Sequence, residues 1–185
     1  MRNRVIFVSA LVGVLVGCTG AFAQEKRQTG LLMGYPVSFG LIFQASDRVA
    51  LRPEVSVSAG TAESTSSLAI NPAATSSSWG IGAAFSVNFY TQSRDKLRTY
   101  VSPRFSYTRG RTTNDLSNSE STNWSYGLSA SFGAEYALND RMSLFAEVGY
   151  GFTGARTSFT LMTTSQENRA LTWGHRSAIG AILYF

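Results

Sequence analysis

The stretch SSWGIGAAFSVNFYT (77–91) alternates between apolar residues and small or polar residues along its whole length. One face of an extended chain would carry Trp79, Ile81, Ala83, Phe85, Val87 and Phe89, and the other Ser78, Gly80, Gly82, Ala84, Ser86, Asn88 and Tyr90. A period of two predicts a β-strand rather than a helix. This strand is also far longer than the common length of about 5–6 residues.

The same alternation recurs in WSYGLSASFGAEYAL (124–138), MSLFAEVGYGF (142–152) and LTWGHRSAIGAILYF (171–185). In all, seven strands are predicted, over 29–44, 48–61, 78–91, 97–110, 122–138, 142–157 and 171–185. Long alternating strands are typical of tilted strands that cross a membrane in a barrel. The predicted fold is therefore all-β, an antiparallel up-and-down transmembrane β-barrel.

The predicted connections alternate between short and long. Short turns fall at 46–48, 94–96 and 139–141, whereas the stretches 61–77, 112–122 and 157–170 are long and rich in Ser, Thr and Asn. The repeat of roughly 45–49 residues has the length of a propeller blade, but a blade needs four short strands. Two long strands per repeat favour barrel hairpins, with tight turns on one rim and long loops on the other.

Large aromatic residues mark two depths on the apolar face. Trp79, Trp124 and Trp173 lie beside the long connections, and Phe43, Phe89, Tyr136 and Phe185 lie near the short turns. Two such belts predict the aromatic girdles at the two interfaces of a membrane. The soluble alternative, a lipocalin-like barrel with its apolar face inside, would crowd these rings into a narrow interior.

The N-terminus predicts export. MRNR is basic, the following 13 residues are apolar and too few to span a bilayer as a helix, and AFA fits a cleavage site. The expected division is a signal peptide at 1–23 and a barrel domain at 24–185. A second interpretation stays open, because Leu15-Val16-Gly17-Cys18 resembles a lipobox that would lipidate Cys18.

The composition limits the chemistry. One Cys excludes an internal disulfide, and one Cys with one His cannot supply the usual zinc ligands, so no metal or cofactor is expected. Of the 16 basic residues, Arg2 and Arg4 lie in the predicted signal peptide, leaving 14 against 11 acidic residues. This scattered excess does not indicate a nucleic-acid partner.

The last residues carry a further signal, because Phe185, Leu183, Ala181 and Ile179 share the apolar face. A terminal Phe preceded by apolar residues at every second position resembles the signal read by the bacterial barrel-assembly machinery. Over roughly residues 28–185 the chain resembles the OmpA/OmpX-like eight-stranded outer-membrane barrels. This resemblance implies a bacterial outer-membrane location, contact with outer-membrane lipids and a monomer.

An even number of strands is expected for such a barrel, yet only seven are clear. Splitting the first segment by a turn at 36–38 would supply the eighth strand, with Leu31 opposite Phe43 and Tyr35 opposite Phe39. Pro53 and Pro103 fall within predicted strands, where each removes a ladder bond, and we interpret them as bulge sites.

Six charged residues are predicted to face the lumen, namely Arg52, Glu54, Arg104, Glu135, Glu147 and Arg176. The interior of an eight-stranded barrel is narrow, so these charges should pair and plug it. A narrow ion path is the alternative interpretation.

Two other groups are candidate sites. His175 and Ser177 lie on the same side of the last strand, as in lipid A deacylases of similar architecture, but no acidic residue follows on that strand. Arg109, Arg111, Arg156 and Arg169 lie where strands meet long connections and could bind anionic head groups.

We therefore expect a non-enzymatic structural or surface-interaction protein that acts through its long extracellular loops on an unknown ligand. The alternatives are a lipid-modifying barrel enzyme and a narrow pore.

Overall fold

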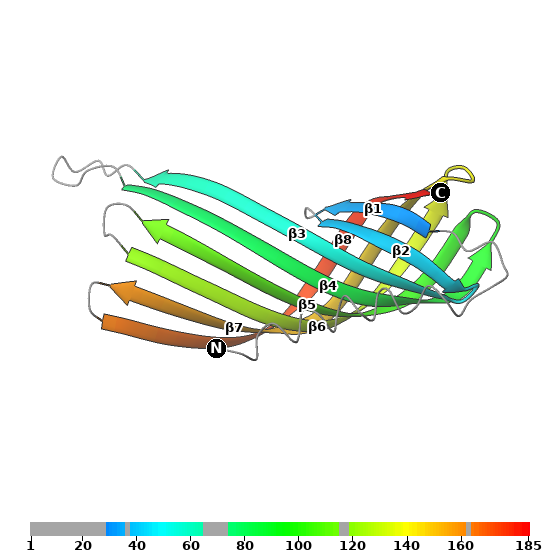
Figure 1. The fold of residues 1–185 in the computed structure, drawn as a ribbon. Coiled ribbons are helices and arrows are strands. Elements are labelled where there is room, and N and C mark those ends of the chain that lie inside the picture. The colour runs from blue at the N-terminus through cyan, green and yellow to red at the C-terminus, as the bar shows by residue number, and fades with distance from the viewer. Residues whose placement is uncertain (1–28, 36–37, 65–73, 115–118, 162–163) are drawn as a thin grey trace, which may run out of the picture.

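The computed structural model describes residues 29–35, 38–64, 74–114, 119–161 and 164–185. Its strands are β1 (Thr29–Tyr35), β2 (Ser38–Ser46), β3 (Val49–Ser64), β4 (Ala74–Arg94), β5 (Leu97–Asn114), β6 (Ser119–Ala137), β7 (Met142–Leu161) and β8 (Thr164–Tyr184). Each strand pairs antiparallel with the next, and β1 pairs with β8 to close the barrel (Figure 1). The predicted eight-stranded all-β barrel is confirmed.

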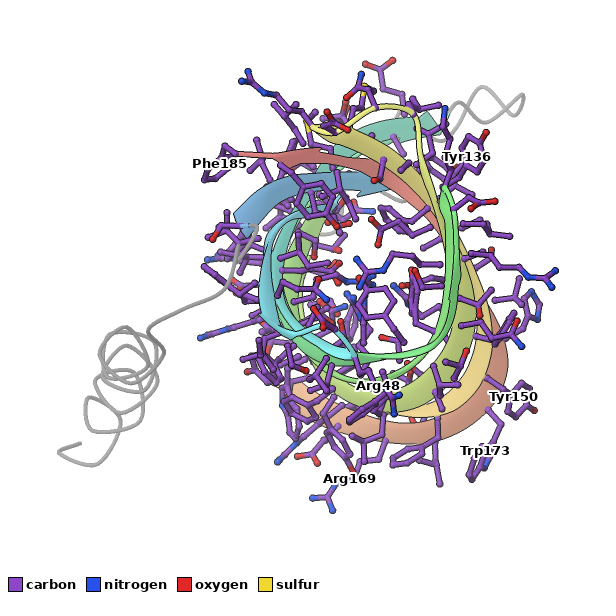
Figure 2. The ribbon with its side chains drawn as sticks, turned by 90° about the vertical axis from the view of Figure 1, so that its right-hand side faces the viewer. Arg48, Tyr136, Tyr150, Arg169, Trp173 and Phe185 are labelled. Atoms are coloured by element: carbon purple, nitrogen blue, oxygen red, sulfur yellow. The ribbon has the colours of Figure 1, made fainter. Side chains whose placement is uncertain are left out.

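The alternating residues separate onto the two faces of the barrel wall. On β4, Phe85 and Phe89 face outward and are 43% and 46% exposed, whereas the neighbouring Ser86 and Asn88 face inward and are 1% exposed. Figure 2 shows Tyr136, Tyr150, Trp173 and Phe185 pointing away from the ring. Most of the large apolar side chains therefore cover the outside of the wall, which is the reverse of a lipocalin-like barrel.

The first hairpin lies where the split was predicted, but its register differs by two residues. β1 ends at Tyr35, β2 begins at Ser38, and Leu31 pairs with Leu41 rather than with Phe43. Because side chains alternate with a period of two, a two-residue shift keeps every side chain on the same face. The alternation therefore could not distinguish these two registers.

The predicted bulges at Pro53 and Pro103 are wrong. Pro53 pairs with Phe85 and Pro103 with Ala130 in an unbroken register. The register shifts lie instead at Gln44–Ser46 in the β2–β3 pair and at Tyr90–Gln92 in the β4–β5 pair. A proline lacks one backbone donor but adds no residue to its strand, so a missing ladder bond does not by itself shift the register.

The three long connections are also corrected, because many of their residues continue the strands. Within the predicted loop 61–77, β3 extends to Ser64 and β4 starts at Ala74. Within 112–122 and 157–170, strand residues reach Asn114 and Leu161 and resume at Ser119 and Thr164. Serine and threonine in paired extended strands gave these stretches a loop-like composition.

Strand length divides the barrel into two halves. β1 and β2 have 7 and 9 residues, whereas β4 and β8 have 21 each. In Figure 1 the outer halves of β3 to β8 fan out well beyond the short β1–β2 hairpin. The wall is therefore complete around the half that holds the short turns, which we call the closed half. The remainder, which we call the outer half, is a curved sheet of six strands.

The predicted signal peptide (1–23) and the alternative lipidation site Cys18 lie outside the described residues. Within the described ranges, no helix is long and apolar enough to cross a membrane.

Candidate functional site

The six charged residues predicted to face the lumen all lie on its side of the wall. Arg52, Glu54, Glu135 and Glu147 are buried, and Arg104 and Arg176 are partly exposed. Five of the six form one connected group, which we call the charge cluster: Arg52, Glu54, Arg104, Glu147 and Arg176. Glu135 lies in a separate group of hydrogen bonds.

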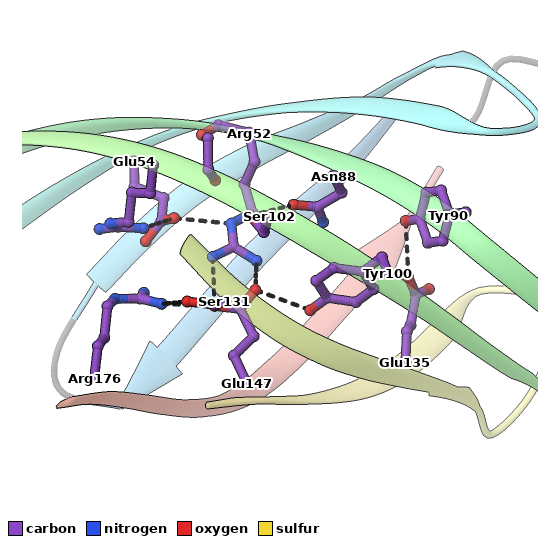
Figure 3. A network of polar contacts seen from close by, with 12 residues as sticks. Arg52, Glu54, Asn88, Tyr90, Tyr100, Ser102, Ser131, Glu135, Glu147 and Arg176 are labelled. Carbon is purple, nitrogen blue, oxygen red and sulfur yellow. Dashed lines mark hydrogen bonds and ion pairs between the residues drawn. The ribbon is translucent and has the colours of Figure 1, made fainter. Parts of the chain in front are cut away.

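Arg52 lies at the centre of the charge cluster (Figure 3). Its Nε donates to Glu54 Oε1 at 2.8 Å, its Nη2 donates to Glu147 Oε2 at 3.0 Å, and its Nη1 donates to Glu147 Oε1. Arg52 and Glu54 are two residues apart on β3, so the strand period places both in the lumen. The planar guanidinium holds the carboxylate of Glu147 by two parallel hydrogen bonds, the strongest geometry for such a pair.

The two other arginines lie on the side of the cluster that faces the outer half. Arg104 Nη1 donates to Glu54 Oε1, and Arg176 Nη1 donates to Glu147 Oε2 at 2.7 Å. Arg104 thus pairs with Glu54 and Arg176 with Glu147, and Arg52 joins the two pairs. Three arginines against two glutamates give the cluster a net charge of +1.

Three tyrosine hydroxyls complete the hydrogen bonding, and sequence reasoning did not identify them as partners. Tyr100 donates to Glu147 Oε1 at 2.9 Å, while Tyr90 and Tyr184 donate to the two oxygens of Glu135 at 3.0 and 2.8 Å. On β4, β5 and β8, the strands that carry these tyrosines, the even-numbered residues face the lumen. The alternation could therefore have located these tyrosines, but it could not have matched them to particular carboxylates.

Below the charge cluster, apolar side chains fill the lumen. The three tyrosines form one buried group with Leu32, Ile42, Ala50, Phe145, Ala178 and Ile182. Tyr100 packs against Gly133 on β6, where an added Cβ would come within 2.5 Å of the ring. Among the described residues, every buried side-chain nitrogen and oxygen has a hydrogen-bond partner. The described part of the closed half is therefore a packed core.

Above the charge cluster the lumen is open. Two adjoining cavities of about 570 and 620 Å³ share Ser38, Ser56, Arg104, Thr108 and Arg176 in their linings. We call this space the vestibule. About half of its other lining residues are Gly, Ser and Thr, which leave room that larger side chains would fill. Arg104 and Arg176, with side chains 13% and 26% exposed, form its floor.

The aromatic residues predicted to form girdles lie on the outer face. Trp79, Trp173, Phe89, Tyr136 and Phe185 are exposed, and Trp124 and Phe43 are half-buried. Ten residues separate Trp79 from Phe89 on β4, which corresponds to roughly 25 Å along the barrel axis at a rise of ~3.3 Å and a tilt of ~40°. This spacing matches the height of the apolar band of outer-membrane barrels.

The four arginines considered for head-group binding lie on the same outer face, beside or beyond the tryptophans. Arg111 pairs across strands with Trp79, and both Arg109 and Arg156 pair with Trp124. Arg111 contacts Glu120 at 2.6 Å, Arg169 contacts Glu167 at 2.7 Å, and Arg156 also contacts Glu167. Together they form a charged band that retains a positive excess.

His175 and Ser177 lie on the outer face of β8, as expected from their spacing. Their cross-strand partners on β7 are Tyr150 and Val148, neither of which is acidic. Within the described residues, no group of three or more His, Cys, Asp or Glu side chains could hold a metal ion.

Solved structures of outer-membrane proteins share this fold. A major outer membrane protein from Thermus thermophilus matches with a TM-score of 0.54 and 13% identity, over 87% of this chain and 100% of that chain. AlkL, determined by solid-state NMR in DMPC bilayers, matches with a TM-score of 0.51 and 16% identity, over 90% and 93%. CarO of Acinetobacter baumannii matches more weakly, with a TM-score of 0.45 and 12% identity over 85% and 97%.

No protein-family model and no curated protein matches the sequence. The likeness to the solved structures shows that the chain has the fold of small outer-membrane β-barrels. The predicted location in the bacterial outer membrane agrees with these structural neighbours.

Proposed function

We propose that this protein is a non-conducting, monomeric outer-membrane barrel that acts as a structural or surface-interaction protein. The observation that carries the proposal is the packed lumen of the closed half. Arg52 and Glu147 are buried at its centre and hold each other by two hydrogen bonds. An aqueous path would need these charges to separate, and separating a buried pair is strongly unfavourable.

The surface available for interaction consists mainly of paired strands. Beyond the tryptophan belt, β3 to β8 continue on the outer side, so a ligand or second surface would meet a sheet as well as the connections between its strands. The ligand itself stays unidentified. The more specific affiliation with OmpA/OmpX-like barrels is part of this proposal, as is recognition of the residues around Leu183 and Phe185 by the assembly machinery.

Contact with outer-membrane lipids is the second part of the proposal. Arg109, Arg111, Arg156 and Arg169 adjoin or extend beyond the tryptophan belt, at the depth where anionic head groups lie. The aromatic and arginine residues would thus fix the position of the barrel along the membrane normal.

Non-enzymatic action is also proposed. His175 and Ser177 share a face, but a His base needs a third group that orients it, and the cross-strand neighbours of this pair offer none. We expect His175→Ala and Ser177→Ala to leave lipid A unchanged. Mass spectrometry of lipid A from a deletion strain complemented with each variant would reveal the enzyme alternative as a change of acylation that either substitution reproduces.

Planar-bilayer recording tests the proposal directly. The purified wild-type barrel should give no steady current steps of porin size. Tyr100→Ala, which removes a ring from the packed lumen, serves as a comparison that tests whether the plug limits conductance. Steady porin-sized steps from the wild-type protein would refute the non-conducting assignment and favour the pore.

A further inference from the structure

The barrel wall has a gap on one side of its outer half. On β2, Phe39 is the last residue to pair with β3, opposite Val55, and on β1, Tyr35 is the last to pair with β8, opposite Ile179. Beyond these points, no described strand pairs with this edge of β3 or of β8, and the two edges diverge in Figure 1. Among the described residues, the vestibule is therefore bounded by strands on most sides but open between β3 and β8.

Part of this gap lies at the depth of the lipid tails. Val55 is four residues below Ala59, which pairs with Trp79, and Ile179 is six residues below Trp173 on the same strand. These separations correspond to roughly 10 and 15 Å below the tryptophan belt, at a rise of ~3.3 Å per residue and a tilt of ~40°. The gap thus opens the vestibule sideways toward the outer leaflet as well as outward to water.

The chemistry changes across the gap. Inside, the floor carries Arg104 and Arg176, which use only their Nη1 groups in the hydrogen bonds described above although a guanidinium has five donors. The charge cluster, of which both arginines are members, has an excess of one positive charge. An anion placed between the two arginines would offset both that excess and the repulsion between two cations.

Outside, an apolar groove of about 490 Å³ runs over β1, β7 and β8 and is lined by Met33, Tyr35, Leu144, Ile179 and Ala181. Tyr35 lines both this groove and the vestibule, so the two spaces meet at its 72% exposed side chain. A polar, cationic pocket therefore adjoins an apolar groove at the lower end of the gap.

We propose that this gap is a lateral binding site for an anionic single-chain amphiphile, a long-chain carboxylate, with its head group on Arg104 and Arg176 and its chain in the outer groove. The lipid tails that surround the barrel cannot form hydrogen bonds with the head group, whereas the arginines of the vestibule can. A small soluble anion would use the arginines but not the groove. A neutral lipid would use the groove but not the arginines.

The site can be tested with the intact barrel in phosphatidylcholine vesicles at pH 9, where the carboxylate of the probe is ionised and arginine stays protonated. The probe is nitroxide-labelled stearate, and its immobilised fraction is measured by electron paramagnetic resonance. We expect wild-type protein to bind stearate at least tenfold more tightly than its methyl ester. Equal binding of the ester would overturn the assignment.

Two variants address the vestibule. Arg104→Gln with Arg176→Gln should lower stearate affinity at least tenfold, to the level of the ester. Gly174→Phe leaves the charge cluster intact and fills the vestibule, because an added Cβ at Gly174 meets nothing within 4 Å. It should also lower the affinity at least tenfold, and unchanged binding by this folded variant would overturn the site. Gly174→Ala is its matched control and should bind like wild type.

Two further measurements separate the other sources of binding. Arg169→Gln removes a charge from the outer arginine band and should leave the affinity unchanged, whereas a tenfold loss would place the head group on that band. Butyrate carries the same head group without a long alkyl chain and should fail to displace the probe at equal concentration. Displacement as strong as that by unlabelled stearate would leave the groove without a role and overturn the lateral site.

Discussion

The two halves of this barrel follow the same alternating rule on their outer face but differ in what fills the inside. In the closed half, the lumen face carries Arg52, Tyr100 and Phe145, which pack and pair until little space remains. In the outer half, the same face carries mainly Gly, Ser and Thr and encloses the vestibule. The period of a strand therefore places its side chains, while their size and charge decide whether the interior becomes a core or a cavity.

The difference also concerns the wall. The closed half has all eight strands, and the outer half has six because the β1–β2 hairpin is short. A complete ring of strands lets charges meet across a narrow, dry lumen, where an unpaired charge is costly. An open sheet leaves its polar groups beside water, where single contacts contribute little. Substitutions in the two halves should therefore differ in their effect on stability.

The largest effect is expected for Glu147→Ala in the closed half. Glu147 accepts hydrogen bonds from Arg52, Arg176 and Tyr100, and its removal leaves a buried arginine without its main partner. We expect a loss of about 3–5 kcal/mol in the free energy of unfolding, the range for breaking a buried pair. Urea unfolding in lipid vesicles measures it, and a loss below about 0.5 kcal/mol, typical of surface sites, would mean that the lumen is wet.

Coupling within the charge cluster sharpens this prediction. Glu147→Ala combined with Arg176→Ala should cost less than the sum of the single substitutions, because the second change removes a cation that the first left unpaired. Strict additivity of the two free-energy changes would show that these side chains act independently.

A backbone position in the closed half should show the next largest effect. Gly133→Ala places a methyl group within 2.5 Å of the Tyr100 ring and should destabilise the barrel by about 1–3 kcal/mol, as overpacking does. Gly174→Ala, in the outer half, meets no atom within 4 Å and should be close to neutral in the same unfolding experiment. Equal effects at the two glycines would break the distinction between a packed and an open half.

Removing one hydroxyl from the lumen should have a similar or smaller effect. Tyr184→Phe deletes one of the two hydrogen bonds that Glu135 accepts from tyrosine, and we expect a cost of about 1–3 kcal/mol because a buried acceptor loses its partner. Tyr107→Phe, on the lipid face, is the matched control and should change the unfolding free energy much less. A Tyr107 effect as large as that of Tyr184 would indicate that the hydroxyl matters for a reason other than burial.

The smallest effect is expected in the outer half. Arg111 and Glu120 lie 2.6 Å apart with nearly half of each side chain exposed. Glu120→Gln should change the unfolding free energy by about 0–1 kcal/mol, and the change should shrink as salt is added. A salt-independent loss comparable to that of Glu147→Ala would show that the outer half is as dry as the closed half.

The amino-acid sequence by itself determined which residues of each strand face lipid and which face the lumen, because side chains alternate between the two faces of a strand. The strand period, the lipid-facing side, the outward position of the aromatic belts and the six lumen charges all follow from this alternation. It also located the first hairpin, since a proline interrupts an otherwise continuous pattern. The ends of the outer strands were missed, because Ser and Thr are common both in loops and in strands that do not face lipid.

Only the tertiary structure decided which lumen side chains meet. Arg52 and Glu147 are 95 positions apart, and their contact depends on the register of every strand between them and on the closure of β1 with β8. The sequence also did not decide between the two registers of the first hairpin, which differ by two residues, and it did not indicate the lateral gap above that hairpin. A register shift by an even number of residues leaves every side chain on the same face, and so does a change in the length of a neighbouring strand. Several arrangements therefore fit the alternation equally well, and closure of the ring selects one of them.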